Sequence, residues 1–117
     1  MNLDILRNER ETRSYDAGQV IFQAGEPGDC MFVVLEGQVE LSVRGKVLER
    51  LGPGGVMGEM ALIDNEPRSA SAITLADTRV VPIRRDRFDA LVQEDPGFSI
   101  QLMRIIVGRL RRMDQKI

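Results

Sequence analysis

Short stretches of alternating hydrophobic and polar residues fill the chain from residue 19 to residue 83. An alternation with a period of two is typical of β-strands. Glycine-rich turns separate the stretches, and the run at 30–36 is almost continuously apolar, which indicates a buried strand. The strands expected from this pattern are residues 19–23, 30–36, 38–44, 47–51, 70–74 and 78–83.

The pattern changes to a helical period after residue 85. Asp86 is a candidate cap for a helix that contains Phe88 and Leu91, and Asp95 followed by Pro96 predicts the start of a second helix that runs to about residue 113. A short N-terminal helix is expected within residues 2–12. The order of elements predicts a mainly β fold with flanking helices, a barrel or double-sheet jelly roll followed by two helices.

Composition limits the possible functions. The chain has 117 residues, enough for one domain, and its net charge of −2 provides no basic field for nucleic acid. Histidine is absent and Cys30 is the single cysteine, so histidine-dependent catalysis, zinc sites and an intramolecular disulfide are not expected. No apolar run is long enough to cross a membrane, and residues 1–6 do not resemble a signal peptide. We expect a cytoplasmic, non-enzymatic protein with no catalytic residues and no metal.

The most informative segment is residues 58–69. Gly58 lets the backbone approach a ligand closely, and the short helical turn expected from Met60 and Ala61 would present backbone N–H groups to an anion. Arg68 supplies a forked donor for phosphate oxygens, and Ser69 adds a hydroxyl beside it. Glu59 would repel a phosphate but can accept a hydrogen bond from a sugar hydroxyl, while Arg68 offsets its charge. This combination predicts a site for a cyclic sugar phosphate.

The sequence VMGEMALI at 56–63, followed by PRSA at 67–70, resembles the phosphate-binding cassette of the cyclic nucleotide-binding domain family, which includes the catabolite activator protein and the regulatory subunits of cyclic-AMP-dependent kinase. Residues 18–22, 25–29, 33–37 and 88–91 are also similar to segments of that family. The resemblance covers roughly residues 14–113.

The resemblance implies a single domain over residues 1–117: an eight-stranded jelly-roll β-barrel at about 14–84, a short N-terminal helix, and C-terminal helices at about 86–114. It implies that Glu59 binds the ribose 2′-hydroxyl and that Arg68 binds the cyclic phosphate. Gly58, Met60, Ala61 and Ser69 would supply backbone or hydroxyl contacts. The ligand would be cyclic AMP or cyclic GMP, with no further cofactor, and the base preference stays open, as does binding of a cyclic dinucleotide.

A second interpretation is a ligand-free protein-interaction or dimerisation module on the same fold. The last helix carries apolar residues at approximately heptad spacing, namely Met103, Ile106, Leu110 and Met113. They could pair this helix with a second copy or an effector protein. The arginines near the end of the helix, Arg109 among them, are expected to form a solvated terminus. Cys30, next to Met31 and Phe32, is expected to be a buried core thiol.

Overall fold

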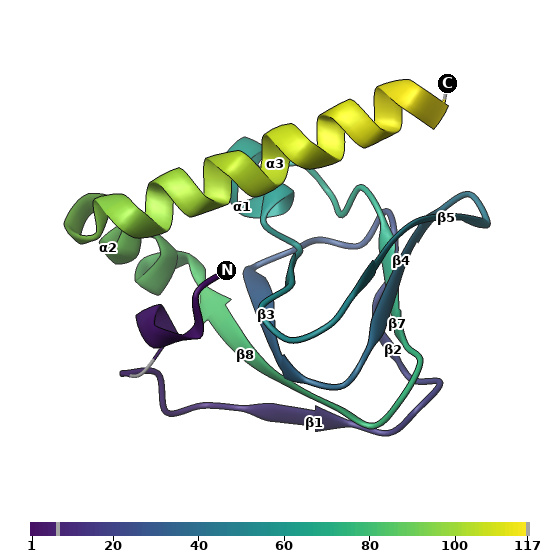
Figure 1. Ribbon diagram of the computed structural model, residues 1–117, viewed down its shortest axis with the longest axis horizontal. Coiled ribbons are helices and arrows are strands. Elements are labelled where there is room, and N and C mark those ends of the chain that lie inside the picture. Colours follow the sequence, from purple (N-terminus) through teal and green to yellow (C-terminus); the bar gives the residue numbers. More distant parts are fainter. Residues whose placement is uncertain (7, 117) are drawn as a thin grey trace.

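A computed structural model of the chain describes residues 1–6 and 8–116, with two antiparallel sheets beneath a long C-terminal helix (Figure 1). The first sheet has the strand order β1 (Arg13–Tyr15), β8 (Thr78–Arg84), β3 (Cys30–Glu36) and β6 (Val56–Met57). The second has the order β2 (Val20–Phe22), β7 (Ser71–Thr74), β4 (Val39–Val43) and β5 (Lys46–Leu51).

Strand β3 joins the two hydrophobic cores of the protein. Its alternate side chains point to opposite faces of the sheet, so Met31 and Val33 pack against the helices while Phe32 and Val34 pack between the sheets. Because both faces are covered, this strand is the continuous apolar run expected from the sequence. Cys30 is 3% exposed and belongs to the core between the sheets, which confirms the expected buried thiol. Burial, with a smaller contribution from Asp29, raises the pKa of the Cys30 thiol.

Two helices follow the last strand. Helix α2 (Arg85–Glu94) turns back into α3 (Pro96–Lys116), and Phe88 of α2 meets Phe98 of α3 edge to face, with ring centroids 6.0 Å apart. Asp95 caps α3 as expected, because its Oδ1 accepts a hydrogen bond from the amide of Phe98 at 3.1 Å. The cap expected at Asp86 is wrong: Arg84 is the N-cap of α2, and Asp86 lies within the first turn.

The sequence-based expectations for the fold are confirmed in outline. The mainly β architecture with antiparallel sheets and C-terminal helices is present, but the strands form two separate sheets and a closed barrel is not observed. The expected N-terminal helix is not confirmed, since the described residues there form only one 3₁₀ turn, η1 (Leu3–Leu6). The strands β1 and β6 were not expected from the alternation.

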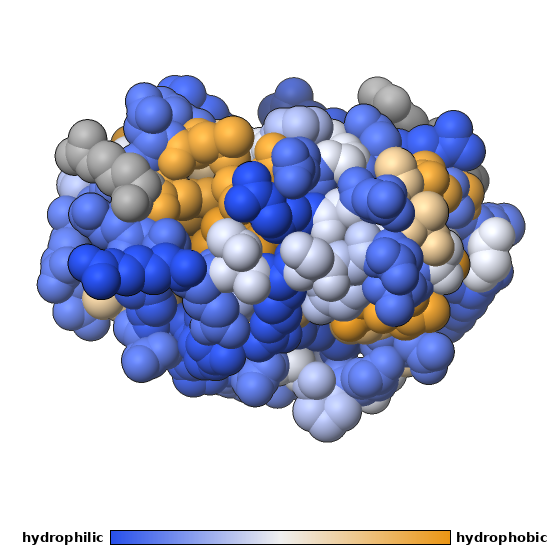
Figure 2. Space-filling model, turned by 90° about the horizontal axis from the view of Figure 1, so that it is seen from below, coloured by the Kyte–Doolittle hydropathy of each residue, from blue (hydrophilic) through white to orange (hydrophobic). Residues whose placement is uncertain are grey.

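The surface away from α3 is mostly hydrophilic, with hydrophobic areas between the polar side chains (Figure 2). In the part of the chain that the structure describes, no helix combines the length and the apolar composition needed to cross a bilayer.

Candidate functional site

A cavity of about 170 Å³ lies between the second sheet, the segment after β6 and the underside of α3. All six residues selected from the sequence line it, namely Gly58, Glu59, Met60, Ala61, Arg68 and Ser69. The remaining lining residues come from β2, β4, β5, Ala70 and the C-terminal half of α3. Ser69 and Met60 lie at the exposed rim, where the Ser69 hydroxyl donates to the Met60 sulfur at 3.7 Å. Segments that are distant in sequence therefore meet around one apolar cavity with two buried charged side chains, Glu59 and Arg68.

The backbone after β6 is shaped by Gly58. Its φ of +78° lies in the left-handed region, and a Cβ at this position would be 2.5 Å from Nη1 of Arg68. Glu59 follows as the N-cap of the short helix α1 (Met60–Asp64), but its side chain makes no capping hydrogen bond. The helix ends at Asn65, which has a φ of +57°. Gly58 therefore serves both the sharp turn into α1 and the close approach of Arg68.

Arg68 is one of the arginines that line the cavity, and its side chain is almost completely buried. It is 6% exposed, and its Nη1 donates to the carbonyl oxygen of Gly58 at 2.9 Å. Its Cζ lies 4.4 Å from the centre of the Phe22 ring, a cation–π contact, and a Cβ on Gly28 would be only 2.7 Å from the same atom. Two glycines and an aromatic ring thus hold the guanidinium in place.

The hydrogen-bonding capacity of Arg68 is not used up. Its Nε is buried and has no hydrogen-bond partner, and Arg68 forms no ion pair with any carboxylate of the described residues. A buried polar group without a partner costs about 1–3 kcal/mol, and more when it is charged. Within the part of the chain that the structure describes, this guanidinium is a preorganised donor that faces the cavity without an anion of its own.

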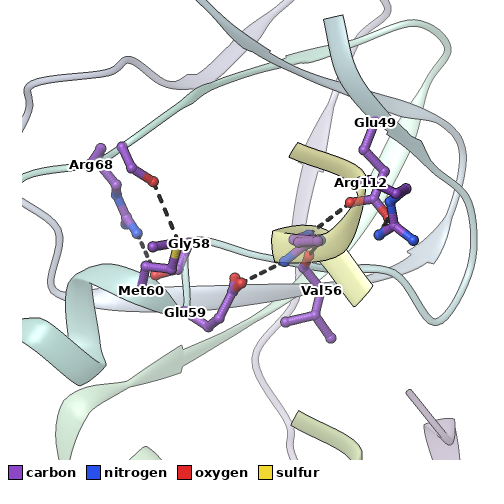
Figure 3. A network of polar contacts seen from close by, with 9 residues as sticks. Glu49, Val56, Gly58, Glu59, Met60, Arg68 and Arg112 are labelled. Atoms are coloured by element: carbon purple, nitrogen blue, oxygen red, sulfur yellow. Dashed lines mark hydrogen bonds and ion pairs between the residues drawn. The ribbon is translucent and has the colours of Figure 1, made fainter. Parts of the chain in front are cut away.

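Glu59 is compensated by an arginine that the sequence interpretation assigned elsewhere. Glu59 is 2% exposed, and its Oε1 lies 2.5 Å from Nη1 of Arg109 on α3. The expectation that Arg68 offsets the charge of Glu59 is therefore wrong. The assignment of Arg109 to a solvated terminus is also wrong, since its side chain is 13% exposed and it lines the cavity. Figure 3 labels Glu59 and marks the contact of its carboxylate with a dashed line.

Arg109 stays charged in this environment. Burial by itself lowers its pKa, but the nearby carboxylates of Glu59 and Glu49 outweigh that effect, and the pKa lies above its ordinary value. The sequence contained one signal for its position. Leu102, Ile106 and Arg109 follow one another at i, i+4 and i+7, so they share the face of α3 that turns toward the sheets. Phe22, Gly28 and Glu49 were also missed, and no local motif marks them as site residues.

The family model for the cyclic nucleotide-binding domain matches residues 12–95, which is most of the chain. The chain belongs to the cyclic nucleotide-binding domain family. Both sheets, the cassette and α2 lie within the matched range, and the whole of α3 lies beyond it.

Relatives of this cyclic nucleotide-binding domain include bacterial regulators. The chain is 30% identical over 117 residues to the CRP-like cAMP-activated global transcriptional regulator of Mycobacterium tuberculosis, covering 96% of this chain and 52% of the regulator. It is 32% identical over 120 residues to the cyclic AMP receptor protein of Thermus thermophilus, covering 98% of this chain and 56% of that protein. The chain thus spans about half the length of these curated relatives.

Solved structures show the same fold. The crystal structure of the Thermus thermophilus catabolite activator protein superposes with a TM-score of 0.80 at 34% identity, covering 91% of this chain and 52% of that one. A structure described as part of a cyclic-GMP-dependent signalling pathway that regulates bacterial phytopathogenesis gives a TM-score of 0.77 at 32% identity, covering 92% of this chain and 89% of that one.

Proposed function

We propose that this domain is a non-enzymatic regulatory module that binds a cyclic mononucleotide, cyclic AMP or cyclic GMP, in the cavity beneath α3. Arg68 binds the cyclic phosphate, together with backbone groups at Gly58, Met60 and Ala61 and the hydroxyl of Ser69. Glu59 accepts a hydrogen bond from the ribose 2′-hydroxyl. The purine lies against the apolar wall of the cavity, below the C-terminal half of α3.

The observation that carries this proposal is the state of Arg68. A buried guanidinium with an unpaired Nε and no carboxylate partner among the described residues is costly to the free protein, and an anionic ligand would remove that cost. Because Arg109 neutralises Glu59, the cavity offers a full positive charge at the Arg68 end and a compensated carboxylate at the other. That distribution suits a ligand with one anionic phosphate and a neighbouring neutral hydroxyl.

Calorimetric titration with cyclic AMP and cyclic GMP tests the proposal. We expect the Arg68→Ala variant to lose about 1.5–3 kcal/mol of binding free energy, because a charge-assisted contact disappears. Arg79→Ala is the matched control, since Arg79 pairs with Glu36 on the exposed surface of β8. Failure of the unmodified domain to bind any cyclic mononucleotide would refute the function, and equal affinity in Arg68→Ala would refute the role of Arg68.

A second candidate function is self-association through α3, and a specific surface favours it. The exposed apolar face of α3 consists of Ile100, Met103, Val107 and Leu110. Their spacing of three and four residues matches a coiled-coil seam. Ile106 is not part of this face as the sequence suggested, because it is partly buried against the core. Leu110 is 50% exposed although it also borders the cavity, and the side chain of Met113 lies outside the described residues. A cytoplasmic location and the absence of a nucleic-acid partner stay predictions.

A further inference from the structure

The C-terminal half of α3 is held over the cavity mainly by charge. Phe98 and Leu102 in its first half are 0% and 4% exposed, whereas no apolar residue among 103–112 is fully buried. Ile105 and Ile106 are only partly buried against the core. Since apolar burial weakens along the helix, the polar contacts of its second half decide whether that half stays on the cavity.

Those contacts converge on Glu49 of β5. Its Oε2 accepts from Nε of Arg109 at 2.7 Å, and its Oε1 accepts from Nη2 of Arg112 at 3.0 Å (Figure 3). Arg109 and Arg112 are three positions apart and lie on one face of the helix. One carboxylate therefore fixes the position of α3 at two points, and sliding the helix by one residue would break both contacts.

Arg109 extends this connection to the ligand site. Beyond Glu49, its guanidinium donates to Oε1 of Glu59 at 2.5 Å and to the carbonyl oxygen of Val56, the first residue of β6. Three donor groups of one side chain thus link α3 to β5, to β6 and to the carboxylate assigned to the ribose. Arg109 contacts only one of the two oxygens of Glu59 in this network, so the geometry is compatible with a ligand hydroxyl on the other.

We propose that Glu49 is a positioning residue for nucleotide recognition: it holds Arg109 against Glu59, and thereby couples closure of α3 to recognition of the ribose 2′-hydroxyl. This proposal rests on the function proposed above. Without the carboxylate of Glu49, Arg109 loses one of its two anionic partners and Arg112 loses its contact with the sheet. Glu59 is then less rigidly oriented, and its hydrogen bond to the ribose weakens.

The test compares Glu49→Gln with the matched control Glu40→Gln. Glu40 lies on the neighbouring strand β4, is 20% exposed against 21% for Glu49, and pairs with Arg50 away from the cavity. Hydrogen exchange without ligand is measured first. We expect the amides of residues 105–112 to exchange several-fold faster in Glu49→Gln than in the unmodified domain, and to be unchanged in Glu40→Gln.

Affinities for cyclic AMP and cyclic GMP, each beside its 2′-deoxy analogue, provide the second measurement. We expect the unmodified domain to bind the ribose form about tenfold more tightly than the 2′-deoxy form. A tenfold ratio in Kd corresponds to the free energy of about one hydrogen bond to a charged group. In Glu49→Gln this preference should shrink to about two- to threefold, because Glu59 is no longer held in position. In Glu40→Gln it should stay near tenfold.

The outcomes separate this inference from the function on which it rests. If the unmodified domain binds no cyclic nucleotide, the proposed function fails, and the coupling to ribose recognition fails with it. If it binds, an equal loss of affinity for the ribose and 2′-deoxy forms in Glu49→Gln overturns the coupling, because a purely structural defect would lower both alike. Unchanged exchange along α3 overturns the role of Glu49 in holding the helix.

Discussion

Replacing Gly28 with alanine tests whether the packing around Arg68 sets nucleotide affinity. Gly28 has no left-handed φ, so the substitution introduces no backbone strain, and its effect comes from the added methyl group alone. That Cβ would lie 2.7 Å from Cζ and Nε of Arg68 and 2.8 Å from Cβ of Ala61. The guanidinium of Arg68 and the turn that carries Ala61 therefore both have to move away from the added methyl group.

The size of the effect follows from these distances. Ordinary van der Waals contact begins near 3.4 Å, so the guanidinium must shift by about 0.7 Å if the backbone stays in place. A shift of that size is enough to lengthen the 2.9 Å bond from Arg68 to the carbonyl of Gly58 beyond hydrogen-bonding range. We expect a loss of about 1.5–3 kcal/mol of binding free energy, which is about 10- to 150-fold in Kd. Overpacking should also lower the free energy of unfolding by about 1–3 kcal/mol.

Isothermal titration calorimetry with cyclic AMP and cyclic GMP measures the affinity, and denaturant unfolding without ligand measures the stability. Gly52→Ala is the control, because its added Cβ would meet only the flexible amide end of Gln38, at 3.1 Å. We expect the control to bind like the unmodified domain. An affinity in Gly28→Ala within twofold of the unmodified domain would show that the position of Arg68 does not govern binding.

Three further outcomes are expected. Phe98→Ala should destabilise the domain by about 3–5 kcal/mol in denaturant unfolding, because Phe98 is fully buried where α2 meets α3; a loss below 1 kcal/mol would contradict the packing described. Cys30 should react with iodoacetamide at pH 8 far more slowly in the folded than in the unfolded protein. Burial raises the pKa of its thiol, so the reactive thiolate stays scarce until the pH exceeds the raised pKa. Equal reaction rates in the two states would contradict the burial of Cys30. If α3 mediates self-association, Met103→Asp with Val107→Asp should shift sedimentation to the monomer, and a monomeric unmodified domain would remove that candidate.

The sequence predicted strands from alternation, as in β4 and β5, or from a continuous apolar run, as in β3. Strand β1 (Arg13–Tyr15) has no buried residue and β6 has only two residues, so neither shows such a pattern. Strand β6 exists because Val56 and Met57 pair with β3, in the register Phe32 to Met57. A contact between segments so far apart along the chain leaves no local pattern.

The candidate site likewise has a part that a local sequence motif predicts and a part that depends on contacts between distant segments. Six residues of the segment from Gly58 to Ser69 could be selected because they belong to one local motif. The structure places these six, Gly58, Glu59, Met60, Ala61, Arg68 and Ser69, around one cavity. The partner of Glu59 could not be selected in this manner, because Arg109 lies 50 positions away and reaches it only after α3 has crossed the sheets. In the sequence Gly28 resembles an ordinary turn residue. Only the structure shows that a side chain at this position would collide with Arg68.

The division of β3 between two cores restricts where the chain can change length. Deleting one residue inside this strand would turn Met31 and Val33 into the space between the sheets and Phe32 toward the helices, so both cores would be filled with the wrong shapes at once. The hairpin between β4 and β5 has no such restriction, since nothing lies within 4 Å of a Cβ built on Gly45. A reporter peptide inserted at that hairpin would extend into solvent, which makes it the natural attachment point for a biosensor built on this domain.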